Sequence, residues 1–363
     1  MVRKILVLNA GSSSLKFAFF SGTQKIIFGK CDRVGSSKSH LVINDYDVVI
    51  NKRIKSFADA VRVVEGVLSE NDLKFDRIGH RVVHGGDLKK TTKINTRVEG
   101  IIKKYAEFAP LHNIPELEVI RVCKKFKKSQ YAVFDTSFFE GLPEVSKIYP
   151  IPKKILKKYK IRRYGFHGIS HKFVSRGLKG KTITCHLGNG ASIAAILNDK
   201  PIDTSMGLTP LEGLMMGSRA GNLDPGLVVF LGKKGFNLQK ILNKESGFKS
   251  LVGKTDIQEI MKIGNKKSEL ALDIFVYKIV EYIGSYIAVL KGFDNLVFTG
   301  GIGENIPLIR KEICDSFGFL GLKIDKNKNS KNLEVISKKR SRVKVYVKKT
   351  DEELMIAKEV LNL

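Results

Sequence analysis

The chain of 363 residues has 43% hydrophobic and 28% charged residues, with 33 Gly and 9 Pro. This composition is typical of a folded α/β or α+β protein and excludes a disordered or fibrous chain, and the length predicts two or three domains. No apolar run approaches the roughly 18 residues of a membrane helix, and the N-terminus lacks a signal-peptide pattern, so we expect a cytoplasmic protein with no membrane partner.

The net charge of +28, from 64 basic and 36 acidic residues, is the unusual global property. Lysines are spread along the chain, with denser runs over residues 147–163 and 338–349, and no aromatic residues alternate with them in a nucleic-acid-binding pattern. A solvated basic surface is therefore favoured and no specific nucleic-acid partner is expected, although salt-sensitive DNA binding stays an alternative. A positive field would also attract anionic substrates.

The first half of the chain alternates β and α patterns. Residues 5–8 and 15–20 predict two strands of a hairpin around the turn NAGSSS, and apolar residues at helical spacing predict a helix over residues 56–68. A strand over residues 75–83 ends in HRVVHGG, and a helix over residues 115–126 precedes a strand over residues 131–134. That strand stops at Asp135, which places a carboxylate where open α/β sheets bind ligands.

The second half repeats this pattern after a basic stretch with several prolines. Strands over residues 182–186 and 192–197 flank a Gly-rich tip, so the two hairpins resemble copies about half a chain length apart. A helix over residues 268–291 leads to a strand over 295–299, a loop GGIGEN, a helix from about Pro307 and a terminal helix over 352–363. We therefore expect an α/β fold of two duplicated domains with a cleft between them.

Three glycine-rich segments, NAGSSS, HLGNGAS and GGIGEN, suit phosphate binding. Glycine lets backbone N–H groups approach an anion, and Ser and Asn add donors. Each segment alone is more simply an ordinary turn, but together, at strand ends in both halves, they favour a nucleotide. The segments GLKGKT and GFKSLVGKT lack the spacing of a P-loop, and the HRD and DFG motifs of protein kinases are absent, so both classes are excluded.

Four charged residues lie in apolar or small-residue surroundings: Arg81 in GHRVVHGG, Asp135 in VFDTSF, His167 in YGFHGISH and Arg219 in GSRAGNLDPG. Any one of them is more simply a structural residue. As a set, two cations, a histidine and a carboxylate are what phosphoryl transfer requires, because an anionic group must be neutralised and oriented.

These segments also carry a family resemblance. The strings NAGSSSLK, GHRVVHGG, APLHN, FDTSF, RRYGFHGISH, HLGNGAS, DTSMGLTPLEG, DPG, FTGGIGEN and TDEEL occur in this order between residue 4 and about residue 356. The chain thereby resembles the acetokinase family of the acetate and sugar kinase, Hsp70 and actin superfamily. The resemblance implies two duplicated actin-like (ribonuclease H-like) domains. The first spans residues 1–148 plus a terminal helix over about 353–363, and the second spans 149–352 with most nucleotide contacts and a homodimer interface.

The activity that the resemblance implies is a reversible transfer of the ATP γ-phosphoryl group to acetate, giving acetyl phosphate and ADP, with Mg²⁺ or alternatively Mn²⁺. A propionate or other short-chain acyl kinase is an alternative, because a small pocket discriminates weakly by size. A non-catalytic nucleotide-binding protein is a further alternative, since one fold hosts many functions. The evidence against a non-catalytic protein is the joint presence of six residues that the family resemblance implies as catalytic or metal-binding: Asn9, Arg81, Asp135, His167, Arg219 and Glu352.

The resemblance also implies roles for individual residues. Asp135, His167, Arg219 and Arg81 are implied as catalytic residues, and Asn9 and Glu352 as the metal site. Acetate would contact Arg81, Val83, Leu111, Phe166 and Pro210. The nucleotide and its phosphates would contact Ser12, Ser14, Lys16, His186, Leu187, Gly188, Asn189, Gly190, Asp256, Ile257, Gln258, Gly300, Gly301, Ile302, Gly303, Glu304 and Asn305.

Two residues depart from the family pattern. Phe139 stands where the family has histidine, and Gln258 stands where an arginine near the nucleotide is expected.

Acetate is ionised at pH 7 and needs no strong base, so we interpret Asp135 as an orienting or metal-shell carboxylate and not as a proton acceptor.

Overall fold

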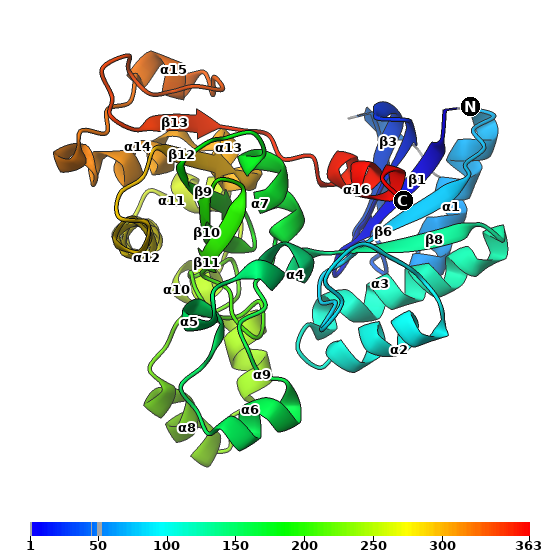
Figure 1. Cartoon of the computed structure of the whole chain (residues 1–363), viewed down its shortest axis with the longest axis horizontal. Helices are drawn as coiled ribbons and strands as arrows, with labels where there is room; N and C mark the ends of the chain where they lie inside the picture. The colour runs from blue at the N-terminus through cyan, green and yellow to red at the C-terminus, as the bar shows by residue number, and fades with distance from the viewer. Residues whose placement is uncertain (1, 45, 49–52) are drawn as a thin grey trace. The chain divides into compact units, whose positions relative to one another are not determined.

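The computed structural model describes residues 2–44, 46–48 and 53–363. The chain divides into two compact units, one formed by Met1–Glu140 with Asp351–Leu363 and the other by Gly141–Thr350 (Figure 1). No helix in the described ranges has the length and apolarity needed to cross a membrane.

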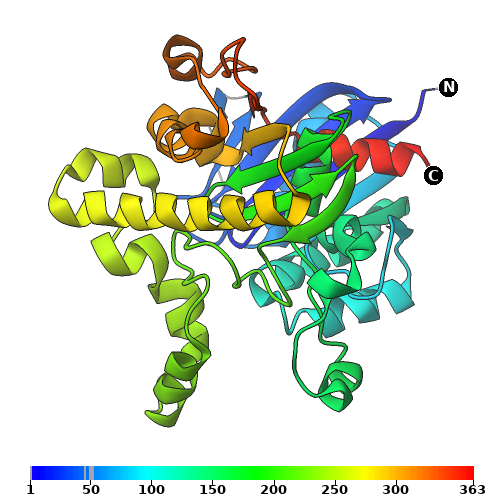
Figure 2. The same ribbon diagram turned by 60° about the vertical axis from the view of Figure 1, so that its left-hand side comes forward.

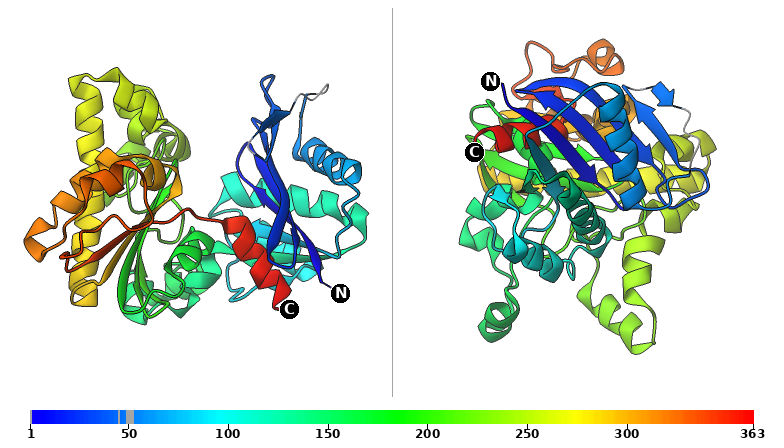
Figure 3. Two further views of the ribbon diagram at one scale, coloured as in Figure 1. Left: turned by 90° about the horizontal axis from the view of Figure 1, so that it is seen from above. Right: turned by 90° about the vertical axis from the view of Figure 1, so that its right-hand side faces the viewer.

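The first unit contains an eight-stranded sheet with the order β5-β4-β3-β2-β1-β6-β8-β7. Its strands are β1 (Lys4–Ala10), β2 (Leu15–Ser21), β3 (Gln24–Asp32), β4 (His40–Ile43), β5 (Tyr46–Val48), β6 (Arg77–Val82), β7 (Thr92–Lys93) and β8 (Ser129–Phe134). Its helices are α1 (Phe57–Glu70), α2 (Thr96–Tyr105), α3 (Pro110–Val122), α4 (Asp135–Phe138) and α16 (Glu352–Leu361). Although α16 ends the chain, it lies beside the N-terminal strands (Figure 3, left).

The second unit contains a five-stranded sheet with the order β11-β10-β9-β12-β13. Its strands are β9 (Lys181–Leu187), β10 (Ala191–Leu197), β11 (Lys200–Thr204), β12 (Asn295–Thr299) and β13 (Lys344–Val347). Its helices are α5 (Glu144–Lys147), α6 (Lys153–Tyr159), α7 (Gly168–Ser175), α8 (Pro225–Lys233), α9 (Leu238–Lys240), α10 (Gly247–Val252), α11 (Ile257–Ile263), α12 (Lys266–Leu290), α13 (Gly300–Asn305), α14 (Pro307–Asp315) and α15 (Lys326–Ser330). The long helix α12 runs across this sheet (Figure 2).

The two sheets share one strand pattern. In the first unit, β3, β2 and β1 are antiparallel neighbours, and β6 and β8 continue the sheet in parallel with β1. In the second unit, β11, β10 and β9 are antiparallel, and β12 and β13 continue in parallel with β9. The predicted α/β fold with two duplicated halves is confirmed, because the hairpins that open each half occupy equivalent positions.

Apolar periodicity accounts for the helix that covers the first sheet. The predicted helix over residues 56–68 is α1, whose side chains at Phe57, Ala60, Val61, Val64, Val67 and Leu68 are buried. Ser56 caps it by accepting a hydrogen bond from Asp59 N at 3.1 Å, as expected for a serine N-cap. The expected start of the next helix at residue 115 was wrong: α3 begins at Pro110, and Pro115 lies inside it.

The segment GGIGEN is a helix and not the predicted loop. Gly300 has φ +77°, and a Cβ there would lie 2.7 Å from Leu187 O, so only glycine fits after β12. The Glu304 carboxylate accepts hydrogen bonds from Gly300 N at 2.9 Å and from Thr350 N at 3.1 Å. These contacts hold α13 in helical form despite three glycines, which would disfavour an isolated helix.

Candidate functional site

Parallel pairing brings Arg81 and Asp135 together in the first unit. Arg81 is in β6, and Asp135 follows β8, the parallel neighbour of β6. Arg81 Nη2 donates a hydrogen bond to Asp135 Oδ2 at 2.7 Å, and its Nη1 lies 3.6 Å from Glu352 Oε2. Asp135 is fully buried. Burial alone would lower the pKa of Arg81, but the carboxylates of Asp135 and Glu352 outweigh it and raise that pKa above its ordinary value.

A buried glutamate that the sequence reasoning missed lies behind this pair. Glu116, in α3, is 1% exposed, and its Oε2 accepts a hydrogen bond from Val83 N at 3.0 Å. Desolvation raises the pKa of Glu116 to about 8 despite the opposing effect of Arg81. The carboxyl is therefore mostly protonated at neutral pH, which leaves Asp135 and Glu352 as the charged partners of Arg81.

Asn9 joins the predicted metal residues in one hydrogen-bonded group at the end of β1. Its Nδ2 donates to Glu352 Oε2 at 3.1 Å and to Glu353 Oε1 at 2.9 Å. Among the described residues no cluster of three or more His, Cys, Asp or Glu is arranged to hold a metal ion. The two carboxylates nevertheless fit Mg²⁺, which prefers hard oxygen ligands and takes the rest from phosphates and water. Asn9 Oδ1 accepts from Arg81 Nη1 at 3.4 Å, so the amide becomes an oxygen ligand only if it turns over.

The remaining predicted residues of the first unit differ in exposure. Gly11 N donates to Ser14 O at 2.7 Å in the turn between β1 and β2, while Ser12 and Lys16 are exposed. Val83 is buried, whereas Leu111 at the start of α3 is 37% exposed. The turn therefore has exposed polar side chains close in sequence to Asn9. The backbone N–H of Val83 donates a hydrogen bond to Glu116.

In the second unit, His167 occupies a strained backbone position at the start of α7. Its φ is +54°, a left-handed conformation that non-glycine residues rarely adopt and that is common at functional sites. The imidazole Nδ1 is 2.9 Å from Ser192 Oγ, and the ring stacks on His186 with centroids 4.3 Å apart. His186 is in turn held by Ser170, whose Oγ lies 2.8 Å from its Nδ1.

Arg219 meets His167 above the glycine-rich tip between β9 and β10. A Cβ at Gly190 would lie 2.8 Å from Arg219 Nη2 and 3.1 Å from His167 Nε2, so the missing side chain makes room for both. Arg219 Nη1 donates to Pro210 O at 2.7 Å, and no carboxylate of the described residues lies within ion-pair distance of this guanidinium. Burial lowers the pKa of Arg219 to about 10. A desolvated cation without a counter-charge is suited to bind an anion.

The residues predicted to contact a nucleotide are all in the second unit apart from those of the first turn. Leu187 ends β9, and Gly188, Asn189 and Gly190 form the tip after it, where Gly188 N donates to Gly190 O at 3.0 Å. Gly301, Ile302, Gly303, Glu304 and Asn305 are in α13, beside β9. Phe166 is buried immediately before His167.

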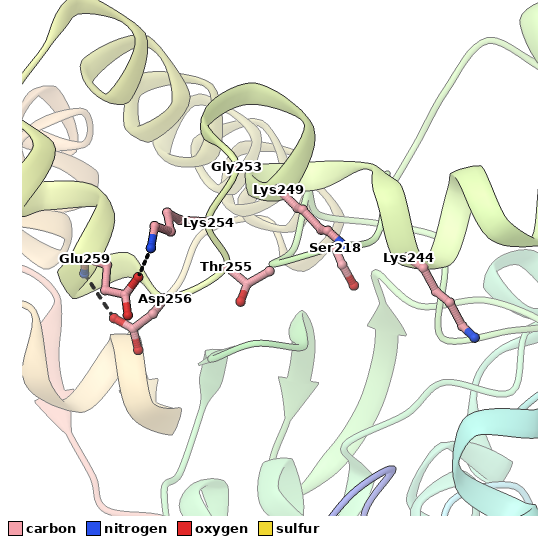
Figure 4. Close-up of a pocket in the computed structure, with 8 residues that line it drawn as sticks. All are labelled: Ser218, Lys244, Lys249, Gly253, Lys254, Thr255, Asp256 and Glu259. Atoms are coloured by element: carbon pink, nitrogen blue, oxygen red, sulfur yellow. Dashed lines mark hydrogen bonds and ion pairs between the residues drawn. The ribbon is translucent and has the colours of Figure 1, made fainter. Parts of the chain in front are cut away.

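Asp256, Ile257 and Gln258 start helix α11 at the edge of a pocket of about 520 Å³ (Figure 4). The Asp256 carboxylate accepts from Gln258 N at 2.8 Å and from Glu259 N at 3.1 Å, so this residue caps the helix. Lys244, Lys249 and Lys254 also line the pocket, and Lys254 pairs with Glu259 at 3.0 Å. The Gln258 side chain is exposed, and Phe139, the other departure from the family pattern, is a buried hydrophobic residue.

The chain is similar to known acetate and propionate kinases over nearly its whole length. The chain is 44% identical to an acetate kinase of Fervidobacterium nodosum and 41% identical to one of Pseudothermotoga lettingae, in each case over 98% of this chain and 96% of the relative. The crystal structure of a propionate kinase from Francisella tularensis has a TM-score of 0.94 at 39% identity and covers 99% of this chain and 100% of that chain. That of Porphyromonas gingivalis acetate kinase has a TM-score of 0.89 at 38% identity, with 99% of both chains covered.

Residues 4–358 match the acetokinase family. The chain belongs to this family of kinases, and the resemblance drawn from its sequence strings is confirmed.

Proposed function

We propose that the chain catalyses the reversible transfer of the γ-phosphoryl group of ATP to acetate, giving acetyl phosphate and ADP. In this reaction an acetate oxygen forms a bond to the γ-phosphorus while the bond from that phosphorus to the β–γ bridging oxygen breaks, and the bond electrons leave with ADP. The observation that carries the proposal is the convergence of Arg219 and His167 over Gly190, in a chain of the acetokinase family.

Arg219 and His167 would act on the phosphoryl group in transfer. Its equatorial oxygens carry negative charge throughout the reaction, and a second anion must approach it. Arg219, which has no carboxylate partner in the described part of the chain, supplies positive charge, and His167 Nε2 faces the same tip. Donors fixed in advance cost no reorganisation when charge develops, which is the usual source of large rate effects.

Arg81 would bind the acetate carboxylate, and Asp135 would orient Arg81. The hydrogen bond of 2.7 Å between them fixes the guanidinium in the first unit. Proton abstraction from acetate is unnecessary at neutral pH, so Asp135 acts through orientation. Val83, Leu111, Phe166 and Pro210 would surround the acetate methyl group, as the family resemblance implies.

Asn9 and Glu352 would hold Mg²⁺, with Glu353 as an additional nearby carboxylate. When bound, the metal supplies charge neutralisation for the phosphate oxygens. The hydrogen bonds from Asn9 Nδ2 keep the carboxylates of Glu352 and Glu353 close together, and the Asn9 side chain would turn its amide to offer Oδ1 to the metal. Ser12, Ser14 and Lys16 would face the phosphates, and the residues around α13 and Asp256 would contact the nucleotide. Mn²⁺ as an alternative metal, a homodimer and a cytoplasmic location stay predictions.

Propionate is a second candidate substrate. The similarity to the solved propionate kinase from Francisella tularensis, with a TM-score of 0.94, favours testing it. One additional methylene changes binding in an apolar pocket by only about 1–3 kcal/mol.

The test is to trap acyl phosphate with hydroxylamine while the purified protein is incubated with Mg-ATP and acetate, propionate or butyrate. We expect rapid hydroxamate formation with acetate, a lower or similar rate with propionate and little with butyrate. A protein that binds ATP and yields no hydroxamate with any of the acids would contradict the proposal. The ratio of kcat/KM between acetate and propionate decides between the two candidate substrates.

A further inference from the structure

A chain of four side chains connects the interior of the second unit to His167. His171 Nδ1 lies 2.7 Å from Thr184 Oγ1, His171 Nε2 lies 2.8 Å from Ser192 Oγ, and Ser192 Oγ lies 2.9 Å from His167 Nδ1. His167 and His171 are four residues apart at the start of α7 and therefore share a helix face. Thr184 and Ser192 come from the neighbouring strands β9 and β10. The four side chains therefore form one continuous series of hydrogen bonds.

The inner members of this chain are isolated from water. Thr184, His171 and Ser192 each have 0% exposure. Desolvation, with a smaller effect of His186, lowers the pKa of His171 well below its ordinary value, so the ring is neutral. A neutral imidazole has one N–H donor and one nitrogen acceptor, and each hydroxyl donates one hydrogen. The Ser192 hydroxyl could accept two hydrogens, but among the described residues it contacts only these two histidines, so its own buried hydrogen is satisfied only if it donates to one of them. The hydrogen bonds therefore all run in the same direction along the chain.

The Thr184 hydroxyl decides which direction this is. Among the described residues its only hydrogen-bond partner is His171. If the bonds ran inward from His167, the Thr184 hydroxyl would accept from His171, and its own hydrogen would be buried with no acceptor. If they run outward, Thr184 donates to His171 Nδ1, His171 Nε2 donates to Ser192, and Ser192 donates to His167 Nδ1. Buried donors are nearly always satisfied, so the outward direction is favoured.

We propose that Thr184, His171 and Ser192 are positioning residues that hold the His167 proton on Nε2. This inference rests on the proposed function, because it makes His167 a neutral hydrogen-bond donor to the phosphoryl group in transfer. The Nε2 atom is the His167 ring nitrogen that faces the Gly190 tip, which Arg219 Nη2 also faces. Arg219 then supplies the charge, and His167 supplies a fixed N–H without needing to be protonated at Nδ1.

The direct test is the ¹⁵N NMR spectrum of histidine-labelled wild-type protein, with the His167 signals assigned by their loss in His167→Gln. We expect His167 to carry its proton on Nε2, because nitrogen shifts distinguish the two neutral tautomers. A proton on Nδ1 would overturn the proposal. This readout requires no turnover and no substitution of Thr184, His171 or Ser192, the three residues that form the relay to His167.

Substitution of Ser192 breaks the link next to His167. Ser192→Ala removes only a hydroxyl from a buried position, so the fold should be kept, as circular dichroism and thermal unfolding would show. We expect kcat to fall by about 10-fold or more, with KM for acetate and ATP close to wild type, and the His167 tautomers to mix. A Ser192→Ala variant with wild-type kcat and the wild-type His167 tautomer would overturn the relay.

A second pair of variants tests the far end of the relay. Thr184→Val keeps the shape of the side chain but removes the donor, whereas Thr184→Ser keeps the hydroxyl. We expect Thr184→Val to lower kcat and to shift the tautomer, and Thr184→Ser to restore both. The matched control is Thr182→Val in the same strand, where the hydroxyl accepts from Asn295 Nδ2 at 3.1 Å and does not contact the relay. Equal effects of the two valine variants would count against the proposal.

Failure of the proposed function and failure of the relay give different results. If wild-type protein forms no acyl phosphate, the proposed function fails, while the tautomer of His167 still decides the relay. If wild-type protein forms acetyl phosphate and Ser192→Ala or Thr184→Val changes neither kcat nor tautomer, the relay alone is overturned.

Discussion

The two arginines assigned to the reaction have opposite surroundings. Arg81, in the first unit, is paired with Asp135 and Glu352, and its positive charge is more than compensated. Arg219, in the second unit, is bonded only to the carbonyl oxygen of Pro210 among the described residues, and burial lowers its pKa to about 10. A compensated arginine is fixed in position and can also lie near a metal ion. An uncompensated one gains its counter-charge only when an anion binds.

The largest effect on turnover is expected from Arg219→Gln. The substitution removes the charge that would neutralise the phosphoryl group, so kcat should fall by about 10²- to 10³-fold. Because the cation has no carboxylate partner among the residues that the structure describes, its removal leaves no buried carboxylate unpaired there, and the free energy of unfolding in urea should stay equal or rise. A large loss of stability would show that Arg219 is a structural residue, and the two arginines would then not differ in the way described.

Arg81→Gln is expected to lower both activity and stability. It would leave the fully buried Asp135 without its cation, and breaking a buried pair costs about 3–5 kcal/mol. Urea unfolding followed by circular dichroism, together with hydroxamate kinetics, separates the two effects. A variant as stable as wild type would mean that Asp135 does not depend on Arg81.

Gly190→Ala tests whether Arg219 and His167 must meet at the tip. The new Cβ would lie 2.8 Å from Arg219 Nη2 and 3.1 Å from His167 Nε2, and both groups would have to move. We expect a fall in kcat of about 10- to 100-fold without loss of fold, since small displacements of catalytic groups are costly. The matched control is Gly284→Ala, at an exposed position of α12 with open space around it, which should keep wild-type activity.

The smallest effect on turnover is expected from Glu116, whose titration changes the stability of the fold with pH. Its pKa of about 8 in the folded protein lies above the ordinary value of 4.5, so between these pH values only the folded state keeps the proton. Stability from this group is therefore complete at low pH and is lost as pH rises towards 8. Relative to wild type, Glu116→Gln should gain in free energy of unfolding between pH 5 and pH 8. A constant difference across this range would mean that Glu116 does not titrate as described.

Local patterns made the framework of each half predictable. The helix expected over residues 268–291 is α12 (Lys266–Leu290), because apolar side chains recur at helical spacing and Asn265 caps its start. The hairpins at the start of each half follow from apolar runs on either side of small residues. The strings around Arg81, Asp135, His167 and Arg219 were sufficient to indicate the family, which the comparisons confirm.

Features that depend on distant contacts were not predictable. Glu304 in the segment GGIGEN accepts a hydrogen bond from Thr350 N, a residue far away in the sequence. The raised pKa of Glu116 comes from burial in the folded chain, which outweighs the opposing hydrogen bond from Val83 N. Glu116 leaves one trace in the sequence, since it is an acidic residue on the apolar face of a predicted helix. Ser192 lies at the end of the string HLGNGAS, but only the packing of α7 on β9 and β10 shows that it contacts His167.

In the proposed function, the carboxylate-rich group of the first unit binds the metal ion and Arg219 of the second unit binds the phosphoryl anion. The most direct test is a magnesium titration of acetyl hydroxamate formation at saturating ATP and acetate, in wild type, Glu352→Gln and Arg219→Gln. We predict that Glu352→Gln needs about 10-fold or more Mg²⁺ for half-maximal rate, because one of few protein ligands is lost. Arg219→Gln should lower the maximal rate with an unchanged magnesium midpoint. A wild-type midpoint in Glu352→Gln, or a shifted one in Arg219→Gln, would contradict this division of roles.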